Sequence, residues 1–142
     1  MAVRKFKPTT SARRKTRLED RSSLVKGSGP KSLSIPKKKK SGRNNRGVIT
    51  VRHRGGGFKR RIRIVDFKRE KLNIPAKVTG FYFDPNRTAF LALLTYADGE
   101  KRYIIAPKDL KVGDTVISGD KVDVLVGNAM RIKNIPSGTY VH

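Results

Sequence analysis

Residues 77–106 read KVTGFYFDPNRTAFLALLTYADGEKRYIIA and contain most of the large apolar side chains of the second half of the chain. Two breaks divide this segment. The first, Asp84-Pro85-Asn86, places Pro in the second position of a turn, and the second, Asp98-Gly99, is typical of a tight hairpin. The segment therefore predicts three short β-strands, at Lys77–Phe83, Ala89–Tyr96 and Lys101–Ala106.

Further short runs of the same type flank this segment, at Val48–Val51, Arg61–Phe67 and Thr115–Ile117. Strands at about ten-residue spacing with few helical signals predict an all-β fold, a small closed or partly open barrel. A sandwich of the same strands is possible, but the number of strands is low for one. The one helical expectation is a single turn over Pro107–Leu110.

The charge of the 142-residue chain is strongly uneven. Its formal net charge is +23 and its pI is about 11.1, which implies a polyanionic partner. Residues 1–74 carry 25 Lys and Arg against 4 Asp and Glu, a charge of +21, whereas the rest of the chain carries only +2. We therefore expect the folded core in the second half and the nucleic-acid contacts in the first.

This partition predicts three segments. Residues 1–45 have neither a helical nor a strand period, and we expect an extended basic RNA-binding arm that orders on a polyanion. A solubilising tail or localisation patch is the alternative, disfavoured because Arg, whose fork suits phosphate, is mixed through the arm. Residues 46–135 are expected to form an RNA-binding barrel, and residues 136–142 an interdomain junction or C-terminal tail.

The segment 41–68, SGRNNRGVITVRHRGGGFKRRIRIVDFK, surrounds three consecutive glycines with cations. Glycine lets the backbone approach a phosphate or base where a Cβ would collide, although a flexible hairpin tip is the simpler alternative. In the strand that starts at Lys59, alternation predicts that Lys59, Arg61 and Arg63 share one face. Ile62 and Ile64 are then expected on the opposite, apolar face. The candidate RNA-binding residues are Lys37, Lys38, Lys39, Lys40, Arg43, Asn44, Asn45, Arg46, Arg52, His53, Arg54, Gly55, Gly56, Gly57, Phe58, Lys59, Arg60, Arg61, Arg63, Lys68, Arg69 and Arg87.

The sequence offers no catalytic constellation. It contains no Cys, and its two histidines, His53 and His142, complete no zinc site. The segment 27–32, GSGPKS, resembles a phosphate loop only superficially, because Pro30 stands where that motif needs Gly. The longest uncharged stretch, 88–97, is far short of the roughly 20 residues that span a bilayer. We expect no enzyme activity, cofactor, metal or membrane partner.

Six ordered blocks identify a family resemblance: GRNNRG, VRHRGGGFK, RIVDFKR, DPNR, DGEKRYIIAP and NIPSGTYVH. With these blocks the chain resembles the N-terminal half of the universal L-two family of large-subunit ribosomal proteins, of bacterial or organellar type. The resemblance implies an extended arm followed by an OB-fold barrel on large-subunit ribosomal RNA. It also implies a structural role in assembly and subunit association, with neighbouring ribosomal proteins as partners, in the bacterial cytoplasm or a mitochondrial or plastid matrix.

Two departures from the family pattern stand out. Phe58 occupies a position where the family usually has His, so a polar contact there would be replaced, for example by stacking on a base. Family members also continue into an SH3-like barrel, which implies either a separately encoded C-terminal half or a truncated chain. A free-standing OB-fold single-strand RNA-binding protein or RNA chaperone is the alternative function; it needs exposed aromatics, and the candidates are Tyr82, Tyr96 and Tyr103.

Overall fold

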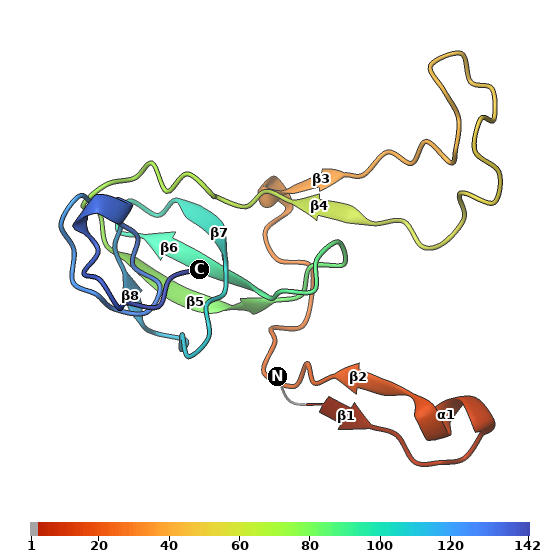
Figure 1. Ribbon diagram of the computed structural model, residues 1–142, viewed down its shortest axis with the longest axis horizontal. Coiled ribbons are helices and arrows are strands. Elements are labelled where there is room, and N and C mark those ends of the chain that lie inside the picture. The colour runs from red at the N-terminus through yellow and green to blue at the C-terminus, as the bar shows by residue number, and fades with distance from the viewer. Residues whose placement is uncertain (1–2) are drawn as a thin grey trace.

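The computed structural model describes residues 3–142 and is built mainly of short strands (Figure 1). None of the helices in this part of the chain is long and apolar enough to cross a membrane. The all-β prediction is confirmed. In chain order the elements are β1 (Val3–Lys5), α1 (Ser11–Lys15), β2 (Arg17–Glu19), η1 (Lys31–Leu33), β3 (Ser34–Pro36), β4 (Arg61–Arg63), β5 (Ala76–Tyr82), β6 (Leu91–Tyr96), β7 (Lys101–Ile105), β8 (Thr115–Val116) and η2 (Ile132–Asn134).

A four-stranded antiparallel sheet in the order β7-β6-β5-β8 forms the centre of the fold. Val78 of β5 pairs with Leu94 of β6, and Leu94 pairs on its other side with Arg102 of β7. The register shifts between Val78 and Gly80, and such a bulge bends a strand and increases its twist. The sheet therefore curls, as a small barrel requires.

One segment hydrogen-bonds at both edges of this sheet. At the β7 edge, the Asp66 N–H donates to the Tyr103 carbonyl over 2.8 Å, next to a parallel bridge between Val65 and Tyr103. Beyond β8, the Asn73 N–H donates to the Ser118 carbonyl over 2.7 Å. The chain between these bonds spans the open side of the sheet, in agreement with the predicted OB-fold-type barrel.

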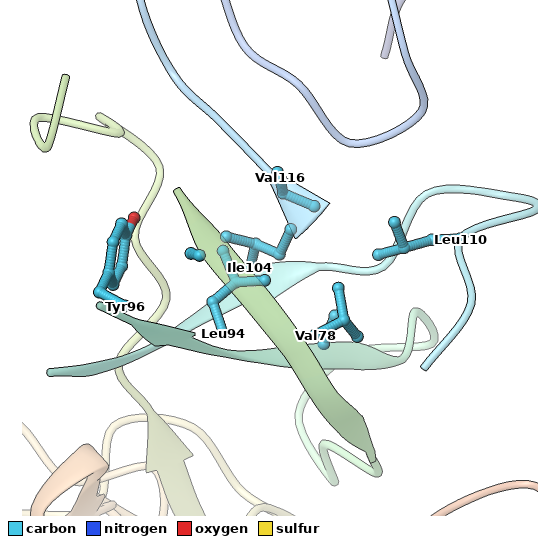
Figure 2. Close-up of a cluster of buried hydrophobic side chains, with 8 residues drawn as sticks. Val78, Leu94, Tyr96, Ile104, Leu110 and Val116 are labelled. Atoms are coloured by element: carbon cyan, nitrogen blue, oxygen red, sulfur yellow. The ribbon is translucent and has the colours of Figure 1, made fainter. Parts of the chain in front are cut away.

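The barrel interior holds the main hydrophobic core (Figure 2). Burial alternates along the first part of β5, because every second side chain of a strand faces the core. Strand β6 differs, since Leu91, Ala92, Leu93 and Leu94 are all buried and both of its faces are therefore covered. The buried side chains of the interior are Ala76, Val78, Ala92, Leu94, Tyr96, Ile104, Leu110 and Val116.

The inner part of the arm packs against the outer face of the sheet. Leu33 packs on a second buried cluster of Leu91, Leu93 and Tyr103. A Cβ at Gly29 would lie 1.9 Å from the Tyr103 hydroxyl oxygen, and Gly29 has a φ of +69°, so this crossing needs glycine. The sequence indicates no such packing, because the apolar residues of the arm show no period.

Backbone hydrogen bonds join the arm to β5 of the sheet at one place and to the chain just after β4 at another. The Val25 N–H donates to the Phe81 carbonyl of β5 over 2.9 Å, and the Ile64 N–H donates to the Leu33 carbonyl over 3.0 Å. These bonds satisfy polar groups on segments that lie against the sheet, and they anchor the arm where it leaves the barrel.

Four strand predictions, including Thr115–Ile117 for β8, agree with the structure to within a few residues, but two details near the glycine triplet are wrong. Val48–Val51 is an exposed loop, with a single bridge between Ile49 and Arg43. The segment lacks a neighbouring strand long enough to pair with. The strand predicted at Arg61–Phe67 is shorter, because β4 ends at Arg63 and resumes only as the bridge at Val65.

The predicted faces of this strand are also wrong. Arg63 is only 8% exposed, whereas Ile62 and Ile64 are 39% and 44% exposed. Ser34 and Arg63 face each other in the β3–β4 register, and both are buried. The β3–β4 ribbon leaves the barrel, so only its inner end is covered (Figure 1). At that end the covered side chains are Ser34 and Arg63, and the two isoleucines are exposed.

A network of charged groups ties the β6–β7 hairpin to the segment that spans the sheet edges. The Lys71 ammonium pairs with Asp98 and Glu100, and Arg102 bonds to Glu100 over 2.7 Å and to Asp66 over 2.9 Å. Lys71 holds the pKa of the Asp98 and Glu100 carboxyls below their usual values, and the bond to Asp98 raises the pKa of Lys71. Folding therefore favours the charged forms of these groups.

We predict that Lys71→Met lowers the melting temperature at neutral pH and that this difference shrinks in acid. A carboxyl with a lowered pKa stabilises the fold at pH values above its ordinary pKa, which is 3.8 for Asp98 and 4.5 for Glu100. This stabilisation is lost as the pH falls through the lower pKa of the folded state. Thermal melts from pH 7 down to pH 2 measure this, with the exposed Lys108→Met as control. A melting difference that does not change with pH would contradict the network.

Candidate nucleic-acid interface

Residues 37–60, here called the basic loop, join β3 to β4 and project away from the barrel (Figure 1). The ribbon continues into it, since the Lys37 N–H donates to the Arg60 carbonyl over 3.3 Å. Every residue from 43 to 60 is exposed. The loop contains no Asp or Glu, and its cations are Lys37, Lys38, Lys39, Lys40, Arg43, Arg46, Arg52, Arg54, Lys59 and Arg60.

Local hydrogen bonds give the first half of the loop its shape. The Asn44 side-chain oxygen accepts the backbone N–H groups of Arg46 and Val48 over 2.9 and 3.1 Å, as in an Asx turn. The Gly42 carbonyl accepts from the N–H groups of Thr50 and Val51. Asn44, predicted as an RNA-binding residue, thus has a local structural role, because its side-chain oxygen is already used within the loop.

The glycine triplet closes the second half of the loop around a lysine. Gly55, Gly56 and Gly57 have φ angles of +127°, +63° and +71°, a conformation that residues with a Cβ rarely adopt. The Lys39 ammonium donates to the Gly56 and Gly57 carbonyls, both over 2.7 Å. A cavity of about 720 Å³ opens here, and Phe58, which lines it, is 88% exposed.

The structure brings most of the predicted RNA-binding residues together in this loop. Lys37–Lys40 and Arg54–Arg60 line or flank the same cavity, and Arg61 continues directly into β4. Asn45, Arg52 and His53 lie on the exposed outer part of the loop, where His53 has a φ of +56°. The candidate interface is therefore an exposed cationic loop with one hollow between its two ends.

Four other predicted residues lie away from this cavity, Arg63 at the inner end of the β3–β4 ribbon and the other three on the barrel. Arg63 is buried, and its guanidinium donates to the Arg61 carbonyl over 3.0 Å. Arg69 is partly buried, donates to the Gly127 carbonyl over 3.5 Å, and has its pKa lowered by that burial. Lys68 is exposed beside Glu70, and Arg87 pairs with Asp84. Arg69 and Arg87 are thus bonded to the barrel, and Arg63 is bonded within the ribbon.

Two of the three barrel tyrosines are core residues, and the third, Tyr82, is half-buried against Tyr103. Tyr96 and Tyr103 are buried, and burial raises the pKa of Tyr103 to about 12. Tyr82 packs edge-to-face on Tyr103 with ring centroids 5.7 Å apart. The alternative function, a single-strand binder that stacks bases on these three rings, therefore loses the residues on which it depends.

Sequence reasoning identified Asp84 and Asn86 as turn residues but missed their role at the base of the loop. Asp84 is 0% exposed and accepts the Asn86 N–H and the Arg87 guanidinium, each over 2.9 Å. The Asn86 side chain then donates to the Arg61 carbonyl over 2.7 Å and accepts from Lys37 over 3.1 Å. We call this set the Asp84–Asn86 anchor. Its partners are distant in sequence, so no local pattern reveals them.

Comparison with protein families gives a match over residues 30–118 to the family described as Ribosomal Proteins L2, RNA binding N-terminal domain. The match covers more than half of the chain. It begins just before η1 and ends just after β8, so it contains the whole basic loop and the four-stranded sheet. The β1–α1–β2 hairpin lies outside the matched range.

We predict that Asp84→Ala destabilises the chain by about 2 kcal/mol, because it removes the buried charged acceptor of the half-buried Asn86 and Arg87 donors. Urea unfolding measures this, and the slope of the transition should stay constant. Asp123→Ala, which removes an exposed carboxylate, is the control and should change little. Equal stability of both variants would show that the anchor does not hold the turn.

Proposed function

The chain belongs to the ribosomal protein L2 family and is a ribosomal RNA-binding protein, and on this premise we propose that it is a structural constituent of the large ribosomal subunit. In that role it supports subunit assembly and the association of the two subunits. The basic loop carries the proposal, because no Asp or Glu occurs between Asp20 and Asp66 to neutralise its cations. RNA phosphates supply the missing negative charge, with release of bound counterions.

Different residues of the loop make different kinds of contact with RNA. Lys and Arg side chains contact phosphates, and Arg adds a planar fork that suits two phosphate oxygens. Asn45 and His53 lie exposed where they can meet base edges or sugar, and the glycines permit close approach of the backbone. Phe58 offers an exposed ring on which an unpaired base can stack.

The proposed RNA-binding set is the one predicted from the sequence. It comprises Lys37, Lys38, Lys39, Lys40, Arg43, Asn44, Asn45, Arg46, Arg52, His53, Arg54, Gly55, Gly56, Gly57, Phe58, Lys59, Arg60, Arg61, Arg63, Lys68, Arg69 and Arg87. Residues of this set on the barrel contribute mainly by fixing the surface from which the loop projects.

Residues 1–45 act as the RNA-binding arm, 46–135 as the barrel domain, and 136–142 as the junction or tail. Neighbouring ribosomal proteins complete the surroundings in a bacterial cytoplasm or an organellar matrix. The role is architectural, without an enzymatic activity of its own.

Co-sedimentation tests this function directly. The chain should remain with purified large subunits in high-salt sucrose gradients, because many simultaneous phosphate and base contacts resist counterion competition better than a non-specific basic protein does. Mass spectrometry of the gradient fractions identifies the chain, and a basic protein of similar charge serves as control. Release into the top fractions together with that control would overturn the proposal.

We predict that Gly56→Val weakens binding to a large-subunit rRNA transcript about tenfold, the equivalent of one lost contact, with a much smaller effect on random RNA. A side chain at this φ of +63° distorts the triplet. Gly138→Val is a matched control, because Gly138 also has a positive φ and open space around its Cβ position. Equal losses on both RNAs would reduce the triplet to a flexible linker.

A further inference from the structure

The four consecutive lysines of the basic loop differ in their surroundings. Lys37–Lys40 directly follows β3, and the Lys37 N–H still bonds to the Arg60 carbonyl across the ribbon. In an extended chain, alternate side chains point to opposite sides. Lys37 and Lys39 therefore share one side of the segment, and Lys38 and Lys40 share the other.

The contacts follow this alternation. The Lys37 ammonium donates to the Asn86 side-chain oxygen over 3.1 Å, which joins the loop to the Asp84–Asn86 anchor. The Lys39 ammonium donates to the carbonyls of Gly56 and Gly57 across the loop. Within residues 3–142, the ammonium groups of Lys38 and Lys40 make no hydrogen bond or ion pair, and both residues are exposed.

We infer that Lys37 and Lys39 are positioning residues that hold the basic loop in its binding shape, whereas Lys38 and Lys40 contact RNA phosphates. The inference deepens the proposed function and rests on it. It separates four identical side chains, all predicted as phosphate contacts, into two pairs with different roles.

The physical reason lies in the glycine triplet. Three glycines in a row have more conformational freedom than any other tripeptide, so an unsupported turn would lose much entropy on binding RNA. One ammonium that bonds two successive carbonyls selects a single shape before RNA arrives. The Lys39 ammonium also neutralises the partial negative charge of these two carbonyls, so they repel an approaching phosphate less.

Lys37 supports the same shape from the other end. Its bond to Asn86 fixes the start of the segment against a turn that is itself held by the buried Asp84. The loop is thus attached to the barrel at Lys37 and closed on itself at Lys39. The cavity between these attachments is lined by Lys37, Lys39, Arg54 and Arg60, among others.

Two double variants of the full chain test the inference, K37A/K39A and K38A/K40A. Both remove the same charge from the same segment, so each is the matched control of the other. Binding to a large-subunit rRNA transcript and to random RNA of equal length is measured over a salt series. K38A/K40A should make the negative slope of log affinity against log salt shallower by about 1.5, the loss of two phosphate contacts, on both RNAs.

K37A/K39A should leave this slope nearly unchanged, but it should reduce the preference for the rRNA transcript over random RNA by about tenfold, as one lost contact would. Chymotrypsin cleavage after Phe58 in the RNA-free chain gives an independent readout. It should be faster in K37A/K39A than in the parent chain, because the turn loses its support, and unchanged in K38A/K40A.

Equal slopes and equal cleavage rates for the two double variants would overturn the inference. If instead the parent chain shows no preference for the rRNA transcript, the proposed function fails. The cleavage comparison still decides the positioning role in that case, because it is made without RNA.

Discussion

Repulsion among like charges is the constraint on which the arrangement of this protein depends. Between Asp20 and Asp66 no carboxylate is available to neutralise any Lys or Arg, so these cations cannot be gathered into a compact core. Most of them lie in an exposed loop at the end of a thin ribbon (Figure 1). Carboxylates of the second half instead form bonds that connect segments of the barrel. Asp84 holds the turn under the loop, and Asp98 belongs to the hairpin network.

A loop of this composition binds selectively only if it has a shape before it meets RNA. The loop contains several glycines, and the structure limits their freedom with few and specific contacts. Asn44 forms a local turn, Lys39 bonds to the triplet, and Asn86 attaches the base of the loop to the barrel. The barrel thus acts as a rigid mount, and the binding surface is built almost wholly outside it.

The arm and the barrel are also more closely connected than their compositions indicate. Both faces of β6 are buried, and the outer face is covered by Leu33 and by the crossing at Gly29. A sheet of four short strands buries little apolar surface by itself, so this second layer adds to its stability. The contacts place the start of the basic loop at a defined position on the sheet.

The sequence by itself determined the all-β class, the three central strands, the uneven charge and the family, because these depend on composition, local period and ordered motifs. Only the tertiary structure decided that Arg63 is buried and Ile62 exposed, that Val48–Val51 is a loop, and that Lys37 and Lys39 face the protein. Alternation divides the side chains of an extended segment into two sets, but it does not say which set will be covered. The covering groups, such as Asn86 and Leu33, come from distant parts of the chain, and only the folded structure brings them there.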